Sequence, residues 1–167
     1  MRVPALLDEP AGHELDDHDR KLFSDVQRHG WHVVAIPAEN DIPGWSFTVG
    51  LTHSFGVPEL AIFGLSDDIR YTSLNIIGEF ARAGEAPQLG SRLSGVLEGY
   101  DIVARAVDSA WNRAMFGYAR WFYRQREPEF LECVWPDLSG RFPWEPEFEA
   151  RHQRLQPALW TTPAQAP

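Results

Sequence analysis

Residues 45–65, WSFTVGLTHSFGVPELAIFGL, decide the fold of this chain. The stretch opens with alternating large apolar and small polar side chains, which is typical of a strand with one buried face. The predicted apolar face consists of Trp45, Phe47, Val49 and Leu51. The predicted polar face consists of Ser46, Thr48 and Gly50. The run ELAIFGL that closes the stretch is almost continuously apolar, so it predicts a strand covered on both sides in the middle of a sheet.

Apolar periodicity predicts a helix on each side of this stretch. The first spans residues 18–29, with Gly30 as its left-handed C-terminal cap, and a strand follows in WHVVAIP at 31–37. Ser66 is placed to cap the second helix, which Gly84 ends. The predicted inward stripe of the second helix consists of Ile69, Leu74, Ile77, Phe80 and Ala81.

The second half of the chain adds a hairpin, an aromatic helix, a strand and a short last helix. The hairpin strands are expected over residues 92–97 and 100–107, the aromatic helix from about residue 108, the strand at 130–136 and the last helix near Pro146. Helices and strands mix without a regular βαβ rhythm. The sequence therefore predicts an α+β fold, a mixed and mainly antiparallel sheet with three to four helices packed on it.

The length of 167 residues suits a single domain. We expect this domain over residues 13–156, between a flexible N-terminal tail (1–12) and a flexible C-terminal tail (157–167), because both ends lack periodicity. Trp160 is the exception in the second tail, and we expect it to dock on its own domain, because an exposed indole leaves apolar area in water.

Composition argues against several classes of partner. With 15 Lys and Arg against 24 Asp and Glu, the formal charge of −9 repels phosphate backbones, so we expect no nucleic-acid partner. No apolar run approaches the roughly 20 residues that span a bilayer, and the N-terminal stretch turns acidic where a signal peptide is apolar. A cytoplasmic protein without a membrane partner is therefore expected. The single cysteine, Cys133, excludes a disulfide within the chain.

Three phrases in a fixed order carry a family resemblance: HGW at 29–31, FTVGLTHSFGVPELAIFGL at 47–65 and VWPDLSGRFPWE at 134–145. Together they resemble the bacterial domain-of-unknown-function family 4262 over residues 22–156. The resemblance implies the extent of the domain and no particular chemistry. The family-like positions are Gly30, Trp31, Thr48, Gly50, Leu51, Pro58, Glu59, Gly64, Asp137, Gly140, Pro143 and Trp144. Phe47 stands where many relatives are expected to carry Tyr.

The first candidate site combines the small polar strand face with the segment that follows it. Ser46, Thr48 and Gly50 are candidate ligand-binding residues, and His53 and Glu59 are candidate catalytic residues. A His–carboxylate pair on a loop can transfer protons near neutral pH. In the alternative interpretation Glu59 only caps loop amides, His53 is a solvated loop residue and the small residues admit a neighbouring element.

The second candidate site is the loop WPDLSGRFPWE at 135–145. Asp137 and Arg141 could orient a polar molecule against the ring of Trp144. In the alternative interpretation the loop is a structural turn, in which Asp137 accepts local amide hydrogen bonds and Trp144 pins the loop to the core.

No metal site is expected, because the six histidines show no metal-ligand spacing such as HExxH. The sequence names no cofactor. Cys133 lies on an apolar strand face, and Ser54 lacks a strand-to-helix elbow, so neither is expected to be a nucleophile.

Three functions are consistent with these patterns. The leading one is binding of a small polar or aromatic molecule. The second is a small enzyme that uses His53 and Glu59 in hydrolysis or isomerisation. The third is a protein-interaction or regulatory module that uses the aromatic segment from Trp111 to Tyr123, through which a homodimer is also predicted.

Overall fold

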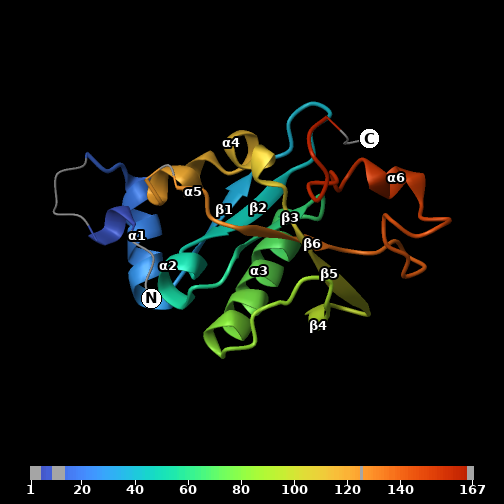
Figure 1. Ribbon diagram of the computed structural model, residues 1–167, viewed down its shortest axis with the longest axis horizontal. Coiled ribbons are helices and arrows are strands. Elements are labelled where there is room, and N and C mark those ends of the chain that lie inside the picture. Colours follow the sequence, from blue (N-terminus) through green and yellow to red (C-terminus); the bar gives the residue numbers. More distant parts are fainter. Residues whose placement is uncertain (1–4, 9–13, 125, 165–167) are drawn as a thin grey trace.

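The computed structural model describes residues 5–8, 14–124 and 126–164. Within them, six strands form one sheet in the order β1-β2-β3-β6-β5-β4 (Figure 1). The strands are β1 (His32–Ile36), β2 (Trp45–Val49), β3 (Glu59–Phe63), β4 (Arg92–Leu97), β5 (Tyr100–Ala106) and β6 (Phe130–Val134). Neighbouring strands are antiparallel except for the central pair β3 and β6. The predicted α+β class, the mainly antiparallel sheet and the central position of β3 are confirmed.

The described residues contain six α-helices and two 3-10 helices, where three to four helices were expected. They are η1 (Leu6–Asp8), α1 (Asp17–His29), α2 (Leu51–Phe55), α3 (Asp67–Arg82), η2 (Ser109–Trp111), α4 (Asn112–Met115), α5 (Gly117–Phe122) and α6 (Ala150–Gln153). The difference has two sources. The segment expected to be a loop after β2 folds as α2, and the predicted aromatic helix is divided at Phe116, whose φ of −129° and ψ of 38° are not helical.

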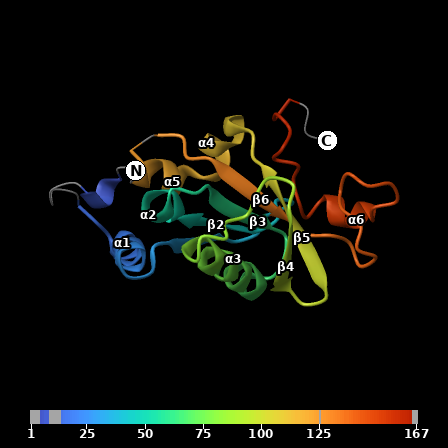
Figure 2. The ribbon, with the colours of Figure 1, turned by 60° about the horizontal axis from the view of Figure 1, so that its bottom comes forward.

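Helices cover both faces of the sheet (Figure 2). On one face Leu74 and Ile77 of α3 pack against Leu60 and Ile62 of β3. On the other face the buried residues of α1 and α5 pack with the apolar side chains of β2, including Phe47. The sheet therefore forms the middle of three layers, and β3 is buried along its whole length.

One predicted cap holds at the end of α1 and one at the start of α3, whereas α3 ends at Arg82 with Ala83, and not the expected Gly84, as its C-terminal cap. Gly30 caps α1 with a φ of 100°, and the Ser66 side chain accepts a hydrogen bond from the Ile69 backbone at the start of α3. The inward position predicted for Ile69 is wrong, because its side chain is 44% exposed. It lies in the first turn of α3 and lines a surface groove with Val96.

Gly50 explains why the apolar face of β2 ends at Val49 and does not include Leu51. Its φ of 117° turns the chain out of the strand, and a Cβ atom there would lie 2.7 Å from the Gly30 carbonyl oxygen. Leu51 was expected on the same face as Val49. It instead begins α2 and is buried in the cluster on the α3 side of the sheet.

The segments that flank the predicted domain also contact it. Ala5 and Leu159 are buried in the same apolar cluster as α1 and α5. The Trp160 ring lies edge-on to the Trp144 ring, with 5.6 Å between their centroids. Trp160 therefore docks on its own domain, as predicted. The domain boundaries at residues 13 and 156 stay predictions.

Gly78 makes room for a buried indole, because a Cβ atom at this position of α3 would lie 2.5 Å from Cε2 of Trp31. We expect Gly78→Ala to lower the free energy of unfolding by about 1–3 kcal/mol, since overpacking outweighs the gain in helix propensity. Gly117→Ala in α5 is the matched control, because its Cβ would meet no atom within 4 Å. Urea denaturation measures both, and a Gly78→Ala protein as stable as the Gly117→Ala protein would contradict the packing argument.

Candidate functional site

Glu59, the first residue of β3, anchors a buried hydrogen-bond network. Its Oε1 atom accepts from the backbone N–H groups of Gly50 and Thr52, at 2.9 and 3.2 Å. Its Oε2 atom accepts from the Thr48 hydroxyl at 2.6 Å, and the Tyr123 hydroxyl also donates to Oε1. All four donors are neutral groups. The carboxyl group thus joins β2, α2, β3 and the residue after α5.

The Tyr123 hydroxyl extends this network. It accepts hydrogen bonds from the backbone N–H groups of Gly50 and His53, each at 3.2 Å. Burial, and then the neighbouring Glu59 carboxyl, raise the pKa of Tyr123, so the hydroxyl keeps its proton and remains a donor to Glu59. Burial also raises the pKa of Glu59, although the hydrogen bonds from Thr48 and Tyr123 oppose the shift.

His53 meets this network through its backbone, and its ring lies elsewhere. The side chain is 1% exposed, its Nδ1 atom lies 3.6 Å from Oδ2 of Asp8, and its ring is edge-on to Phe122. The accessible loop expected around His53 is therefore wrong, because the segment is helical and buried. Neither the His53 ring nor the Glu59 carboxyl is open to solvent in this conformation.

The small polar face of β2 is covered as well. Ser46 is buried, and its hydroxyl accepts a hydrogen bond from Nε of the buried Arg70 of α3 at 3.1 Å. The Thr48 hydroxyl accepts one from the Leu60 backbone at 2.9 Å. These residues admit a neighbouring helix and strand, so the open face expected for a ligand is absent from this part of the described chain.

Asp137 organises the second candidate loop. Its Oδ1 atom accepts from the backbone of Ser139 and Arg141, and its Oδ2 atom accepts from Arg141 Nε at 3.2 Å and from the Glu149 backbone at 3.1 Å. Burial raises the pKa of Asp137, but the backbone hydrogen bonds outweigh it and leave the pKa below its usual value. The Asp137 side chain is thus directed at its own loop.

Trp144 lies apart from this carboxylate and is 38% exposed. Its ring stacks on Phe142 at 5.2 Å, and the Arg105 guanidinium lies 4.3 Å from its centroid. Arg141 forms ion pairs with Asp137 and Glu147. Of the predicted trio, Asp137 and Arg141 thus contact each other, whereas the contacts of the Trp144 ring are with Phe142, Arg105 and Trp160.

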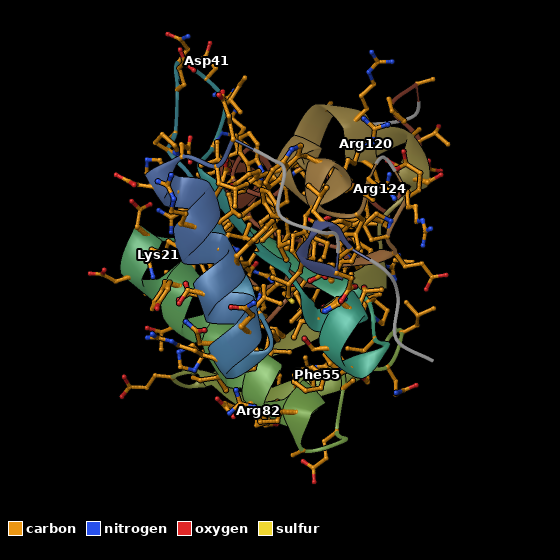
Figure 3. The ribbon with its side chains drawn as sticks, turned by 90° about the vertical axis from the view of Figure 1, so that its left-hand side faces the viewer. Lys21, Asp41, Phe55, Arg82, Arg120 and Arg124 are labelled. Carbon is orange, nitrogen blue, oxygen red and sulfur yellow. The ribbon has the colours of Figure 1, made fainter. Side chains whose placement is uncertain are left out.

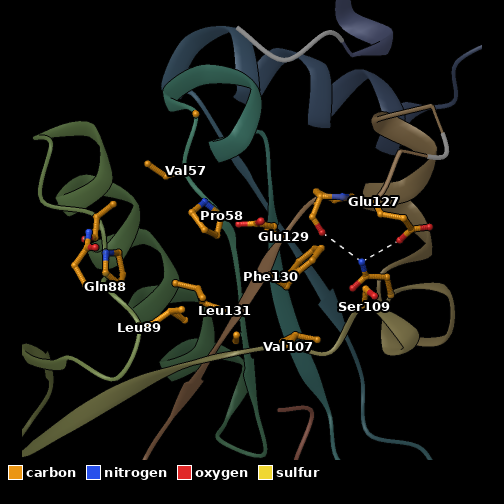
Figure 4. Close-up of a pocket in the computed structure, with 16 residues that line it drawn as sticks. Val57, Pro58, Gln88, Leu89, Val107, Ser109, Glu127, Glu129, Phe130 and Leu131 are labelled. Atoms are coloured by element: carbon orange, nitrogen blue, oxygen red, sulfur yellow. Dashed lines mark hydrogen bonds between the residues drawn. The ribbon is translucent and has the colours of Figure 1, made fainter. Parts of the chain in front are cut away.

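A cleft that sequence reasoning missed lies where β3 and β6 begin (Figure 4). It has a volume of about 440 Å³, within the range of small-molecule sites. Gln88 and Leu89 lie on one side of it and Ser109 and Glu127 on the other, with Phe130 between them. The remaining walls include Val57, Pro58, Asn112, Glu129 and Leu131.

A neighbouring hollow connects the cleft with the residues of the Glu59 network. A neighbouring hollow of about 310 Å³ uses the same Pro58 and Glu129 and reaches Thr52 and Tyr123, two donors to the Glu59 carboxyl. The Glu59 backbone N–H also donates to the Glu129 carbonyl at 2.8 Å. The predicted candidate residue Glu59 thus positions the walls of the cleft and does not itself line it.

The sequence model of one family matches residues 25–149, and its description is Domain of unknown function (DUF4262). The chain belongs to this family. The match confirms the resemblance carried by the three phrases, and for this DUF4262 domain no curated protein and no solved structure matches.

The part of the chain that the structure describes contains neither a candidate membrane span nor a candidate metal site. Among residues 5–8, 14–124 and 126–164, no helix has both the length and the apolar character that crossing a bilayer requires. The same residues contain no group of three or more His, Cys, Asp or Glu side chains placed to hold a metal ion.

Replacing Glu59 with Gln should change how stability depends on pH. Because burial raises the Glu59 pKa above its ordinary value of 4.5, the native state holds this proton more tightly than the unfolded state. As pH rises from about 4.5, the pKa of Glu59 in the unfolded chain, through its higher pKa in the native state, the wild-type protein should therefore lose stability relative to Glu59→Gln. Urea denaturation at a series of pH values measures the difference, and parallel curves for the two proteins would contradict the shift.

Tyr123→Phe should destabilise the protein through its lost hydroxyl. The change leaves the His53 backbone N–H without this acceptor and Glu59 without one donor, which costs about 1–3 kcal/mol in a buried site. Tyr71→Phe is the matched control, because this tyrosine is 59% exposed. Thermal and urea unfolding of both variants test the expectation, and equal stabilities would rule out the network as a source of stability.

Proposed function

We propose that this DUF4262 domain binds a small molecule with a positively charged group and an apolar body. The observation that carries the proposal is the cleft at the start of β3 and β6, whose lining combines the acidic residues Glu127 and Glu129 with apolar residues. The location in the cytoplasm and the absence of a nucleic-acid partner remain predictions from composition.

The two acidic residues of the lining favour a cation. Glu129 is exposed, and among the described residues its carboxylate has no ion-pair partner. Glu127 is held in place by Arg120 Nε at 2.8 Å and by Asn112 Nδ2 at 2.9 Å. An ammonium group between the two carboxylates would gain a partner for Glu129, and the chain charge of −9 attracts cations to the whole surface.

The apolar residues of the lining favour a hydrocarbon or aromatic body on the same ligand. Pro58, Leu89, Phe130 and Leu131 line the cleft, and Leu89 is 66% exposed. A ligand that covers Leu89 would remove apolar surface from water, which is worth about 25 cal/mol for each Å².

The two other functions have less support. An enzyme that uses His53 and Glu59 needs both side chains to reach a substrate, and both are buried. An interaction module that uses the aromatic segment needs exposed rings, whereas Phe116, Phe122 and Tyr123 are buried in their own core. The homodimer through this segment stays a prediction.

Benzylammonium is a suitable probe because it joins a ring to an ammonium group. In a titration followed by NMR, we expect its addition to shift the signals of Ser109, Phe130 and Glu129. Glu129→Gln should weaken binding roughly threefold, the size of an exposed ion pair. Glu98→Gln, in the β4–β5 turn and outside the lining of the cleft, is the matched control and should bind like wild type.

Benzoate has the same shape and the opposite charge, so it should not shift the cleft signals. The proposal would be overturned if benzylammonium left these signals unchanged, or if Glu129→Gln and Glu127→Gln both bound it as tightly as wild type. Native mass spectrometry of freshly purified protein adds an independent readout, because a retained cationic molecule would identify the natural ligand class.

A further inference from the structure

A second cleft lies beside the edge strand β1, between α1 and α3. It has a volume of about 400 Å³ and is lined mainly by polar side chains. Figure 3 looks onto this side of the molecule, with Lys21 labelled on α1 and Arg82 on α3. The cleft shares no lining residue with the one at the start of β3 and β6.

An imidazole–carboxylate pair forms one wall of this second cleft. The Nδ1 atom of His32 lies 2.7 Å from Oδ2 of Asp25, and both side chains are largely buried. Lys21 Nζ also donates to Oδ2 of Asp25 at 3.0 Å. Asp25 and Lys21 come from α1 and His32 from β1, so the pair fastens the helix to the edge of the sheet.

This contact fixes the tautomer of the His32 ring. An ionised carboxylate only accepts hydrogen bonds, so the proton of a neutral imidazole must lie on Nδ1. The other ring nitrogen, Nε2, then carries a lone pair and can accept a hydrogen bond. Among the described residues no donor reaches Nε2, and His32 lines the cleft.

The charged groups of the cleft are already paired. Lys21 pairs with Asp25 at 3.0 Å, and Glu79 pairs with Arg82 at 3.2 Å. An ionic ligand would therefore have to compete with an existing ion pair for its counter-charge. A neutral ligand with a hydrogen-bond donor has no such competitor at His32.

We propose that this cleft binds a neutral, hydroxyl-bearing small molecule, whose O–H group donates a hydrogen bond to Nε2 of His32. Asp25 is a positioning residue, because it acts only by holding the ring. The side chains of Trp31, Tyr71 and Asn75 complete the cleft and offer aromatic and polar contacts to the rest of the molecule.

The ionisation of the pair supports this geometry. Burial raises the Asp25 pKa, but the hydrogen bonds from His32 and Lys21 outweigh it and leave the pKa low. Burial lowers the His32 pKa below its ordinary value of 6.5, against the opposing effect of Asp25 and with small additions from Lys21 and His18. His29 of α1 and Tyr71 and Glu79 of α3 face the same cleft. The affinity should therefore be highest where the His32 ring is neutral and decline as pH falls through the His32 pKa.

The test uses benzyl alcohol, with benzoate and benzylammonium as charged probes of the same shape. In NMR titrations benzyl alcohol should shift the His32 ring and Asn75 side-chain signals, and the charged probes should bind there at least about tenfold more weakly. Long-range proton–nitrogen spectra should show His32 with its proton on Nδ1. A proton on Nε2, or equal binding of all three probes, would overturn the proposal.

Two variants separate the ring from general effects on folding. His32→Gln should abolish the benzyl alcohol shifts, while His152→Gln, which changes a histidine of α6 that does not line this cleft, should keep them. Asp25→Asn keeps the His32 ring but removes the carboxylate that fixes the ring proton on Nδ1. This variant should therefore populate both tautomers of His32 and bind benzyl alcohol more weakly. Wild-type affinity in both His32→Gln and Asp25→Asn would refute the site.

Discussion

The buried carboxyl group of Glu59 is the contact on which the rest of the structure depends. It collects hydrogen bonds from the Thr48 hydroxyl, the Gly50 and Thr52 amides and the Tyr123 hydroxyl, and so ties β2, α2 and β3 to the residue that follows α5. A carboxyl group can be buried without a cation only where enough donors surround it. The turn at Gly50, the short helix α2 and the end of α5 are all held in the arrangement that provides these donors.

The two clefts of the DUF4262 domain differ in the charge of the ligand that they favour. The cleft at the start of β3 and β6 has an acidic group without an ion-pair partner among the described residues, so its chemistry favours a cation. The cleft beside β1 has paired charges and an imidazole whose pKa is lowered by burial, so its chemistry favours an uncharged donor. Under the two proposals, the same framework would recognise two ligands of different charge.

Elements with a strong period could be predicted from the sequence, and sites assembled from distant segments could not. The apolar run of β3 and the capped helix α3 were predicted because each carries its own pattern. Helix α2 was missed because five residues are too few to show a helical period. The role of Glu59 as a cap for nearby amides was foreseen as the alternative to catalysis, but its Tyr123 partner lies 64 positions away.

The cleft itself escaped prediction because its walls come from four separate segments of the chain. One signal for it was present. Pro58 and Glu59 open β3, and Pro128 and Glu129 precede the start of β6, so the same dipeptide marks the adjacent ends of the two parallel strands.

The parallel pairing also governs how the chain can assemble. β6 enters the sheet between β3 and β5, so the apolar edge of β3 stays open during synthesis until the last strand has emerged. A polypeptide that stopped before residue 130 would leave that edge available to other chains, and aggregation would be its natural fate.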